Sequence, residues 1–284
     1  MRFLALIIFL ALSACAPLRA FNTLVPKDTG GGRAAVDQAF GEGDRRKLDI
    51  YAPTRLAAGS KLPIIVFFYG GSWNSGTKEG YAFVGRALAA RGFVVVIPDY
   101  RLVPEVRFPG FLEDGAAAVK WVRANAPRFG GDPDNMVLAG HSAGAYNAAM
   151  LSLDPRWLGP DRAAIRGFAG LAGPYDFLPL DGITKPVFGD APDLDATQPV
   201  NFAGAGDPPT LLMVAGKDTL VGPRNSERLA QLLSKAGEQA NIRTYPEVGH
   251  VGILTAIAKP FRGRASVLDD LAGFAGSVTE ATKK

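Results

Sequence analysis

The sequence predicts an α/β fold in which a mostly parallel central β-sheet is flanked by helices. Short apolar runs rich in β-branched and aromatic residues alternate with stretches of helical pattern, as expected of repeated β-α-β units. The chain has 284 residues, of which 48% are hydrophobic, and α/β folds of this size are commonly single domains. We therefore expect one folded domain over residues 33–284.

The predicted elements follow one another in an order that suits this fold. Residues 36–40 and 46–51 are short segments separated by glycines, which predicts a hairpin at the margin of the sheet. Buried strands are predicted at residues 63–69, 93–97, 136–139, 165–169, 210–215 and 242–245. Helices are predicted at residues 81–90, 111–125, 143–153, 227–236 and 266–274. Right-handed crossovers between such strands give a mostly parallel sheet, and its ligands bind beyond the carboxyl ends of the strands.

Residues 174–209 interrupt this alternation. The segment holds seven prolines and shows little periodicity, so it is interpreted as a surface insertion over the end of the sheet. Two roles are consistent with its composition, a cap over a substrate pocket and a plain irregular connection.

The strongest motif lies between a predicted strand and a predicted helix. Residues 140–144 read Gly-His-Ser-Ala-Gly and match G-x-S-x-G in the strand, turn, helix context that gives this motif its meaning. Ser142 is expected on a tight turn with its hydroxyl projecting from the sheet edge. The Ala143 N–H begins a helix, where unpaired donors and the macrodipole favour a developing negative charge. The sequence therefore predicts Ser142 as an activated nucleophile.

A serine hydroxyl needs a base to remove its proton and a third group to orient that base. The chain has two histidines. His141 is next to Ser142 in the turn, where successive side chains diverge, so it is expected to pack or form a hydrogen bond beneath the turn. His250 follows the last predicted strand, in an expected loop. By elimination and by position, His250 is the predicted general base.

Asp218 is the predicted orienting carboxylate. It follows the strand at residues 210–215 after only Gly216 and Lys217, which places it at the same end of the sheet as the nucleophile, and the order Ser, Asp, His is known for such triads. Glu247 is too close to His250 in sequence to orient it easily. The rival aspartates follow no comparable strand: Asp176, Asp190, Asp193, Asp195 and Asp207.

Residues 69–73, Tyr-Gly-Gly-Ser-Trp, follow a buried strand and have glycines that let successive N–H groups face a ligand. Such donors stabilise the oxyanion of an acyl-transfer intermediate. Trp73, Tyr146 and Phe177 are candidate pocket walls, with a place in the core as the alternative for each. This chemistry requires neither a metal nor a cofactor, and none is predicted.

Several motifs resemble those of a known family. Y-G-G-S-W resembles the H-G-G-G-[FW] oxyanion loop of α/β-hydrolase carboxylesterases, and residues 98–109 with 111–114 resemble the D-Y-R-L-A-P-E…F-P…E-D stretch of hormone-sensitive-lipase-like esterases and their feruloyl-esterase-like (BD-FAE) relatives. Residues 216–221 and 248–252 resemble the acid and histidine loops of those families. The resemblance runs from about residue 47 to the carboxyl end.

The resemblance implies an α/β-hydrolase fold and oxyanion donors at the N–H groups of Gly71, Ser72 and Ala143. Two departures accompany it. Tyr69 stands where those families have a histidine that braces the loop, so this loop is expected to be held differently. The chain also has no evident large amino-terminal cap, which leaves both the hormone-sensitive-lipase branch and the smaller feruloyl-esterase or formamidase-like branch open.

The amino terminus predicts export. Arg2 precedes an apolar run at residues 3–12 that is too short to span a bilayer but suits a secretory signal. Residues 12–15, Leu-Ser-Ala-Cys, resemble the lipobox of bacterial lipoproteins. We therefore expect a signal peptide over residues 1–14, lipidation at Cys15 and a flexible tether over residues 15–32. Cleavage at Ala14-Cys15-Ala16 to release a soluble envelope protein, or retention as an uncleaved anchor, are the alternatives.

Taken together, these features predict a serine hydrolase of short-acyl carboxylic esters in the bacterial cell envelope. Ala16 after the cysteine favours the outer membrane as the site of the anchor. The mild net charge of +4 and the lack of a basic cluster make nucleic acid an unexpected partner. An amidase of the arylformamidase type is the nearest alternative, and a non-catalytic binding module on the same fold is another.

Overall fold

The computed structural model describes residues 15–280. Within them, eight strands form one sheet in the order β1-β2-β4-β3-β5-β6-β7-β8. The strands are β1 (Gly31–Ala39), β2 (Lys47–Pro53), β3 (Leu62–Phe68), β4 (Val94–Pro98), β5 (Gly131–His141), β6 (Ile165–Leu171), β7 (Thr210–Ala215) and β8 (Ala240–Tyr245). The predicted strands are confirmed, with ends that differ by up to a few residues.

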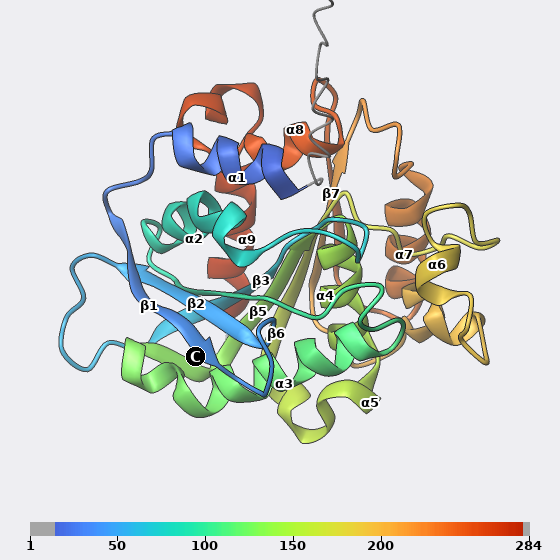
Figure 1. Cartoon of the computed structure of the whole chain (residues 1–284), viewed down its shortest axis with the longest axis horizontal. Coiled ribbons are helices and arrows are strands. Elements are labelled where there is room, and N and C mark those ends of the chain that lie inside the picture. Colours follow the sequence, from blue (N-terminus) through green and yellow to red (C-terminus); the bar gives the residue numbers. More distant parts are fainter. Residues whose placement is uncertain (1–14, 281–284) are drawn as a thin grey trace, which may run out of the picture.

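Helices surround the sheet (Figure 1). Over the described range the α-helices are α1 (Cys15–Leu24), α2 (Ala82–Ala89), α3 (Gly110–Asn125), α4 (Ala143–Leu153), α5 (Pro155–Leu158), α6 (Lys185–Phe188), α7 (Arg224–Lys235), α8 (His250–Thr255) and α9 (Val267–Glu280). Short 3₁₀ helices are η1 (Lys78–Tyr81), η2 (Ala126–Phe129), η3 (Gly159–Ala164), η4 (Asp195–Thr197), η5 (Pro199–Phe202) and η6 (Lys259–Arg264).

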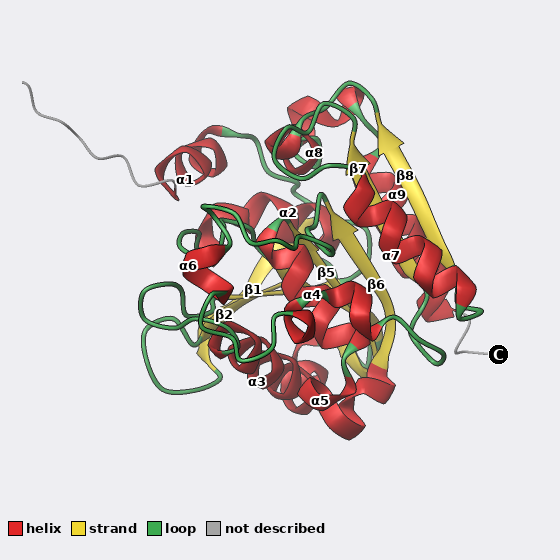
Figure 2. Ribbon diagram, turned by 90° about the vertical axis from the view of Figure 1, so that its right-hand side faces the viewer, coloured by secondary structure: helices red, strands yellow, loops and turns green. Residues whose placement is uncertain are grey.

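The sheet is mostly parallel, as predicted. The pairs β1/β2 and β2/β4 are antiparallel, and the five pairs from β4/β3 to β7/β8 are parallel. Helices α2 and α9 pack on one face, and α3, α4 and α7 pack on the other, so the strands lie between two helical layers (Figure 2). Every residue of β4 is buried, because a strand covered on both faces favours a continuous apolar run.

The strand order creates the place for a ligand. β3 pairs with β4 on one side and with β5 on the other, so the chain leaves the carboxyl ends of β3 and β5 toward opposite faces of the sheet. Open α/β sheets bind ligands in the crevice at such a switch point. The two segments that follow β3 and β5 are the loop at residues 69–76 and the turn at Ser142.

The structure differs from the flexible tether expected over residues 15–32. The backbone of residues 15–24 forms α1, and β1 begins at Gly31. The Phe21 ring meets the Phe83 ring edge to face, with centroids 5.3 Å apart, and the Asn22 Oδ1 atom accepts the Phe83 N–H at 3.0 Å. Apolar residues at a helical spacing hold this segment against the domain. The glycines at residues 30–32 favour a flexible tether when the sequence alone is considered. The predicted signal peptide, residues 1–14, lies outside the described residues.

The insertion at residues 174–209 is irregular but anchored. The Asn225 side chain accepts the N–H groups of Tyr175 at 2.7 Å and Asp176 at 2.8 Å. The Gln198 Oε1 atom accepts the Phe177 N–H at 2.8 Å. These side chains provide the acceptors that regular secondary structure would otherwise supply to the backbone.

Candidate active site

Ser142 occupies the sharp turn between β5 and α4. Its backbone has φ 55° and ψ −124°, a strained conformation for a residue with a side chain. The flanking glycines make the turn possible. A Cβ atom at Gly140 would lie 2.3 Å from the Gly144 oxygen, and a Cβ atom at Gly144 would lie 2.1 Å from the Phe68 oxygen. The turn therefore depends on close backbone approach between β3, β5 and α4.

Ser142, His250 and Asp218 form a continuous hydrogen-bonded chain. The His250 Nδ1 atom lies 2.8 Å from Asp218 Oδ2, and the His250 Nε2 atom lies 2.8 Å from Ser142 Oγ. A carboxylate can only accept, so Nδ1 carries the proton, and Nε2 is left to accept the Ser142 hydroxyl proton. This is the arrangement in which a neutral imidazole can remove a proton from a serine hydroxyl.

The Asp218 carboxylate is buried and held from two sides. Its side chain is 1% exposed, and Oδ1 accepts the N–H groups of Leu220 at 2.8 Å and Val221 at 2.9 Å, while Oδ2 faces His250. The rival aspartates have other partners. Asp176 pairs with Arg224, Asp190 with Arg107 and Asp207 with Arg162, and the Asp193 side chain accepts the N–H of Asp195.

His250 is the first residue of α8, where a loop was expected. Ile253 and Leu254 of that helix are buried, so apolar residues just after the histidine dock the helix on the domain. The other histidine, His141, is buried beneath the turn, as its position predicts. Its Nε2 atom donates to the His250 main-chain oxygen at 2.8 Å.

The loop after β3 is bent by residues with positive φ. Gly71 has φ 133°, Ser72 has φ 50° and Trp73 has φ 55°. The Asn74 and Ser75 N–H groups both donate to the Gly71 oxygen, at 3.1 and 3.0 Å. The loop is therefore a tight turn beside Ser142, and the first N–H groups of α4, from Ala143, have no acceptor within that helix.

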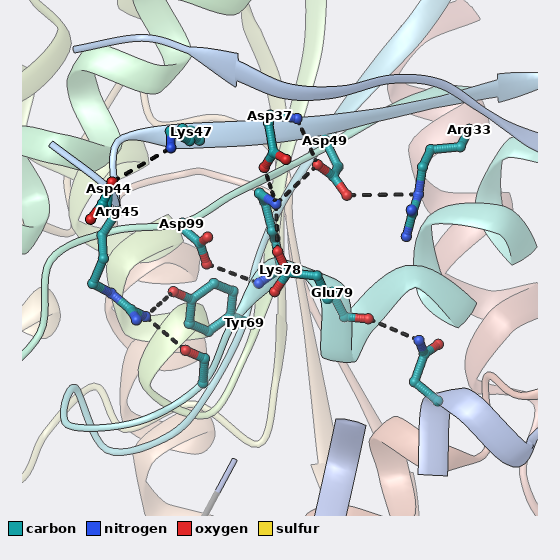
Figure 3. Close-up of polar contacts among 12 residues, drawn as sticks. Arg33, Asp37, Asp44, Arg45, Lys47, Asp49, Tyr69, Lys78, Glu79 and Asp99 are labelled. Atoms are coloured by element: carbon teal, nitrogen blue, oxygen red, sulfur yellow. Dashed lines mark hydrogen bonds and ion pairs between the residues drawn. The ribbon is translucent and has the colours of Figure 1, made fainter. Parts of the chain in front are cut away.

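Tyr69 is hydrogen-bonded to Arg45. The Arg45 Nη2 atom donates to the Tyr69 hydroxyl at 2.9 Å and to the Gly76 oxygen at 2.7 Å (Figure 3). Arg45 Nε donates to the Tyr100 oxygen at 2.9 Å. The rings of Tyr69 and Tyr100 stack with centroids 4.6 Å apart. The guanidinium thus joins both ends of the loop at residues 69–76, which the sequence did not reveal.

An ionic cluster surrounds the Lys78 side chain, close to this brace (Figure 3). The Lys78 ammonium, 3% exposed, lies 2.7 Å from Asp37, 3.1 Å from Asp49 and 2.6 Å from Glu79. Burial alone would lower the Lys78 pKa, but hydrogen bonds to Asp37 and Glu79 raise it. The Lys78 N–H donates to Asp99 at 2.9 Å, and burial raises the pKa of that carboxyl to about 6. The segment after the loop is therefore fixed by charge as well as by packing.

Two cavities open at Ser142. We call the cavity of about 710 Å³ the large cavity; it is lined by α1, the loop at residues 70–77 and α8. The small cavity, of about 90 Å³, is lined by residues that include Trp73, Ala143 and Phe177. Five residues of the insertion at 174–209 line the small cavity: Pro174, Phe177, Asp181, Ile183 and Thr184. The insertion therefore contributes a wall of this cavity.

The three candidate pocket residues lie at different depths. Trp73 and Phe177 line the small cavity. Tyr146 is fully buried behind them, and its hydroxyl donates to the Thr197 oxygen at 2.8 Å. Tyr146 is therefore a core residue behind the cavity wall, which was the alternative expected for it. In the part of the chain that the structure describes, no group of three or more His, Cys, Asp or Glu side chains is arranged to hold a metal ion.

Family models and curated proteins match this chain. The BD-FAE family model matches residues 48–158, and the prolyl oligopeptidase family model matches residues 180–280. Esterase LipQ from Mycobacterium tuberculosis is 27% identical over 262 residues, covering 84% of this chain and 61% of that protein. The isoprenylcysteine alpha-carbonyl methylesterase ICME from Arabidopsis thaliana is 27% identical over 258 residues, covering 82% of this chain and 60% of that protein.

Solved structures share the fold. Esterase B from Lactobacillus rhamnosis, with an inhibitor bound, gives a TM-score of 0.82 at 18% identity over 94% of this chain and 93% of that chain. The apo form of Thermogutta terrifontis esterase 2 gives 0.72 at 21% identity over 89% and 96%. The solved structures show the α/β-hydrolase fold, and the family models and curated relatives support an α/β-hydrolase carboxylesterase family for this chain. The chain spans about three fifths of the length of the two curated relatives described above.

Proposed function

We propose that this chain is a serine hydrolase that cleaves carboxylic esters with a short acyl group. The observation that carries the proposal is the pair of 2.8 Å contacts that link Asp218 to His250 and His250 to Ser142. Several curated relatives are named as esterases, which supports the same reaction class.

In this mechanism, the Ser142 oxygen attacks the ester carbonyl carbon while His250 Nε2 takes the hydroxyl proton. When the tetrahedral intermediate collapses, the bond from carbon to the alcohol oxygen breaks, and His250 returns the proton to that oxygen. Water then attacks the acyl-enzyme by the same route, which releases the acid and restores the Ser142 hydroxyl. Asp218 holds the imidazole in the required tautomer and stabilises its transient positive charge.

The tetrahedral intermediate carries a negative oxygen that needs fixed donors. In this proposal the donors are the N–H groups of Gly71, Ser72 and Ala143. The loss of one such donor costs on the order of 10²–10³ in rate. Gly71 lines the large cavity, Ala143 lines the small cavity and Ser72 lines both, which supports the assignment.

Turnover of p-nitrophenyl esters from acetate to laurate tests the proposal. We expect activity that is greatest with short acyl groups and that falls about 10⁶-fold in Ser142→Ala. Paraoxon should transfer a diethyl phosphoryl group to the intact chain, and peptide mass spectrometry should locate it on Ser142. Near-normal turnover by folded Ser142→Ala, or labelling at another residue, would refute the mechanism. Matched anilides run in parallel separate ester from amide preference.

We also propose that Cys15 is lipidated and that the protein is anchored in the cell envelope. The lipobox-like residues 12–15 support this. Over residues 15–280, none of the helices combines the length and the apolar character that spanning a bilayer requires. The active site would then lie close to the membrane anchor, because α1 starts at Cys15 and its residues Leu18, Arg19 and Phe21 line the large cavity.

A further inference from the structure

The large and small cavities meet at Ser142 and differ almost eightfold in size. They hold about 710 and about 90 Å³. Ser72, Ser142 and Leu220 belong to the walls of both, so the reacting oxygen stands at their junction. A water molecule takes up about 30 Å³ of liquid, so the small cavity has room for about three non-hydrogen atoms and the large cavity for about twenty-four.

The position of His250 shows which part of an ester enters which cavity. His250 lines the large cavity and is absent from the residues that line the small one. In the proposed reaction, His250 Nε2 gives a proton to the departing alcohol oxygen, so that oxygen must lie beside the imidazole within hydrogen-bond reach. The alcohol part therefore extends into the large cavity. The acyl part, on the other side of the carbonyl carbon, enters the small cavity beside Ala143.

The large cavity has an apolar lining. Its walls include the side chains of Leu18, Phe21, Tyr81, Val251 and Leu254. Val251 is 57% exposed. Covering such surface with an apolar group stabilises a complex by about 25 cal/mol for each Å² removed from water. The cavity therefore favours an apolar alcohol over a polyhydroxylated one.

Helix α1 forms one side of this cavity and is held in place by specific contacts. Asn22 Nδ2 donates to the Glu79 oxygen at 2.9 Å, while Asn22 Oδ1 accepts the Phe83 N–H. Asp28, just after the helix, pairs with Arg262 at 2.9 Å. These contacts join α1 to η1, α2 and the segment after α8, and Figure 1 shows α1 and α8 at the same end of the molecule. Helix α1 is thus a fixed part of the wall of the large cavity.

We propose that the site selects esters that combine an acyl group of about two to four carbons with a bulky apolar alcohol, and that α1 contributes to binding that alcohol. This inference rests on the proposed function and adds the substrate class to it. The reaction consumes one water and yields a short carboxylic acid and the free alcohol.

Two isomeric esters test the inference on the intact, full-length protein. Decyl acetate has the small acyl group and the large alcohol, and methyl undecanoate has the reverse arrangement with the same atoms. We expect kcat/KM for decyl acetate to be about tenfold higher or more, because misplaced methylenes cost about tenfold or more each in a closed pocket. Equal rates, or a preference for methyl undecanoate, would overturn the inference.

Two substitutions in α1 test the role of the helix. Leu18→Trp narrows the large cavity and should lower the ratio of kcat/KM for decyl acetate to that for ethyl acetate about tenfold. Leu24→Trp is the matched control, because Leu24 is 83% exposed and lies outside the cavity, so it should keep the parent ratio. An unchanged ratio in Leu18→Trp would exclude α1 from the binding surface. The comparison of decyl acetate with methyl undecanoate uses the parent protein alone, so it tests the substrate preference even if Leu18→Trp fails to fold.

Hydrolysis of p-nitrophenyl acetate tests the proposed function separately from the substrate preference. If p-nitrophenyl acetate is hydrolysed by the parent and spared by Ser142→Ala, the function stands, and only the isomer preference decides the substrate class. If neither p-nitrophenyl acetate nor either isomer is hydrolysed by folded protein, the proposed function itself is lost.

Discussion

The His141 Nε2 atom donates a hydrogen bond to the main-chain oxygen of His250, and the two atoms lie 2.8 Å apart. The residue before the proposed nucleophile therefore holds the backbone of the proposed base. Because a carbonyl can only accept, this contact requires the neutral tautomer with its proton on Nε2 or the charged form. His141 is buried, which favours the neutral one.

The first prediction concerns stability in acid. Burial, and then the neighbouring His250, lower the His141 pKa to about 3, whereas histidine in an unfolded chain has a pKa near 6.5. Below about pH 6.5, His141 binds a proton in the unfolded chain, whereas the buried His141 of the folded protein stays neutral. The folded state therefore loses stability as the pH falls from 6.5 toward 3. His141→Gln keeps a donor without titrating. The difference in urea midpoint between parent and variant should shrink from pH 7.5 to pH 5, and a constant difference would contradict this.

The second prediction separates Asp218 from the other aspartates. Asp218→Asn should lower kcat about 10⁴-fold, because an amide favours the wrong imidazole tautomer. Asp176→Asn is the control, since Asp176 pairs with Arg224 at 3.0 Å and should keep kcat within about threefold. Steady-state rates on p-nitrophenyl acetate give both values. Similar losses of kcat in the two variants would show that Asp218 has no special role in orienting His250.

The third prediction concerns the brace of the loop at residues 69–76. Arg45→Leu should lower kcat by up to about 10²-fold with a smaller change in KM, because a small displacement of oxyanion donors affects the transition state most. Arg45→Lys should recover only part of the loss, since lysine lacks the planar fork. Arg91→Leu, which removes an exposed pair with Asp269, is the control. A loss confined to KM, or to thermal stability, would show that Arg45 does not position the loop.

The fourth prediction concerns the packing of the turn at Ser142. Gly144→Ala should destabilise the fold by about 1–3 kcal/mol or more, because the new methyl group would meet the Phe68 oxygen. Gly273→Ala in α9 meets nothing within 4 Å, so the higher helix propensity of alanine should stabilise the fold by about 1 kcal/mol. Denaturant unfolding of both variants measures these values. Equal effects would argue against close backbone packing at the turn.

The fifth prediction concerns the anchor. Cys15→Ala should move the protein from the membrane fraction to the soluble fraction of cells, because it removes the proposed site of lipidation. Mass spectrometry of the parent should show an acylated amino terminus at residue 15. Unchanged fractionation of the variant would favour an uncleaved signal segment as the anchor.

Much of the fold could be predicted because the pattern of its elements is local. The helix at residues 143–153 and the strand at residues 210–215 match α4 and β7 residue for residue. Ser142 was predictable from its motif, and His250 and Asp218 from elimination and chain order. The first inference needs only neighbouring residues, and the other two need a short set of candidates and the order of the strands.

The missed features depend on contacts between distant segments. Arg45 meets Gly76 across 31 positions, and no spacing rule connects an arginine to a carbonyl so far along the chain. Helix α1 lies where the sequence predicts a tether, because Phe21 docks on Phe83 and Asp28, beyond the helix, pairs with Arg262. The two cavities are likewise products of packing, so neither their sizes nor the depth of Tyr146 could be derived from sequence.

The unequal cavities on the two sides of Ser142 allow the site to distinguish the two enantiomers of a ligand. Consider a racemic phosphonate whose phosphorus carries one small and one large group besides its oxygen and leaving group. With the phosphoryl oxygen held by the N–H donors, one mirror image directs its small group into about 90 Å³ and its large group into about 710 Å³. The other mirror image would force the large group into the small cavity. The protein would thus consume one enantiomer and leave the other in solution, although it makes no chiral contact with phosphorus itself.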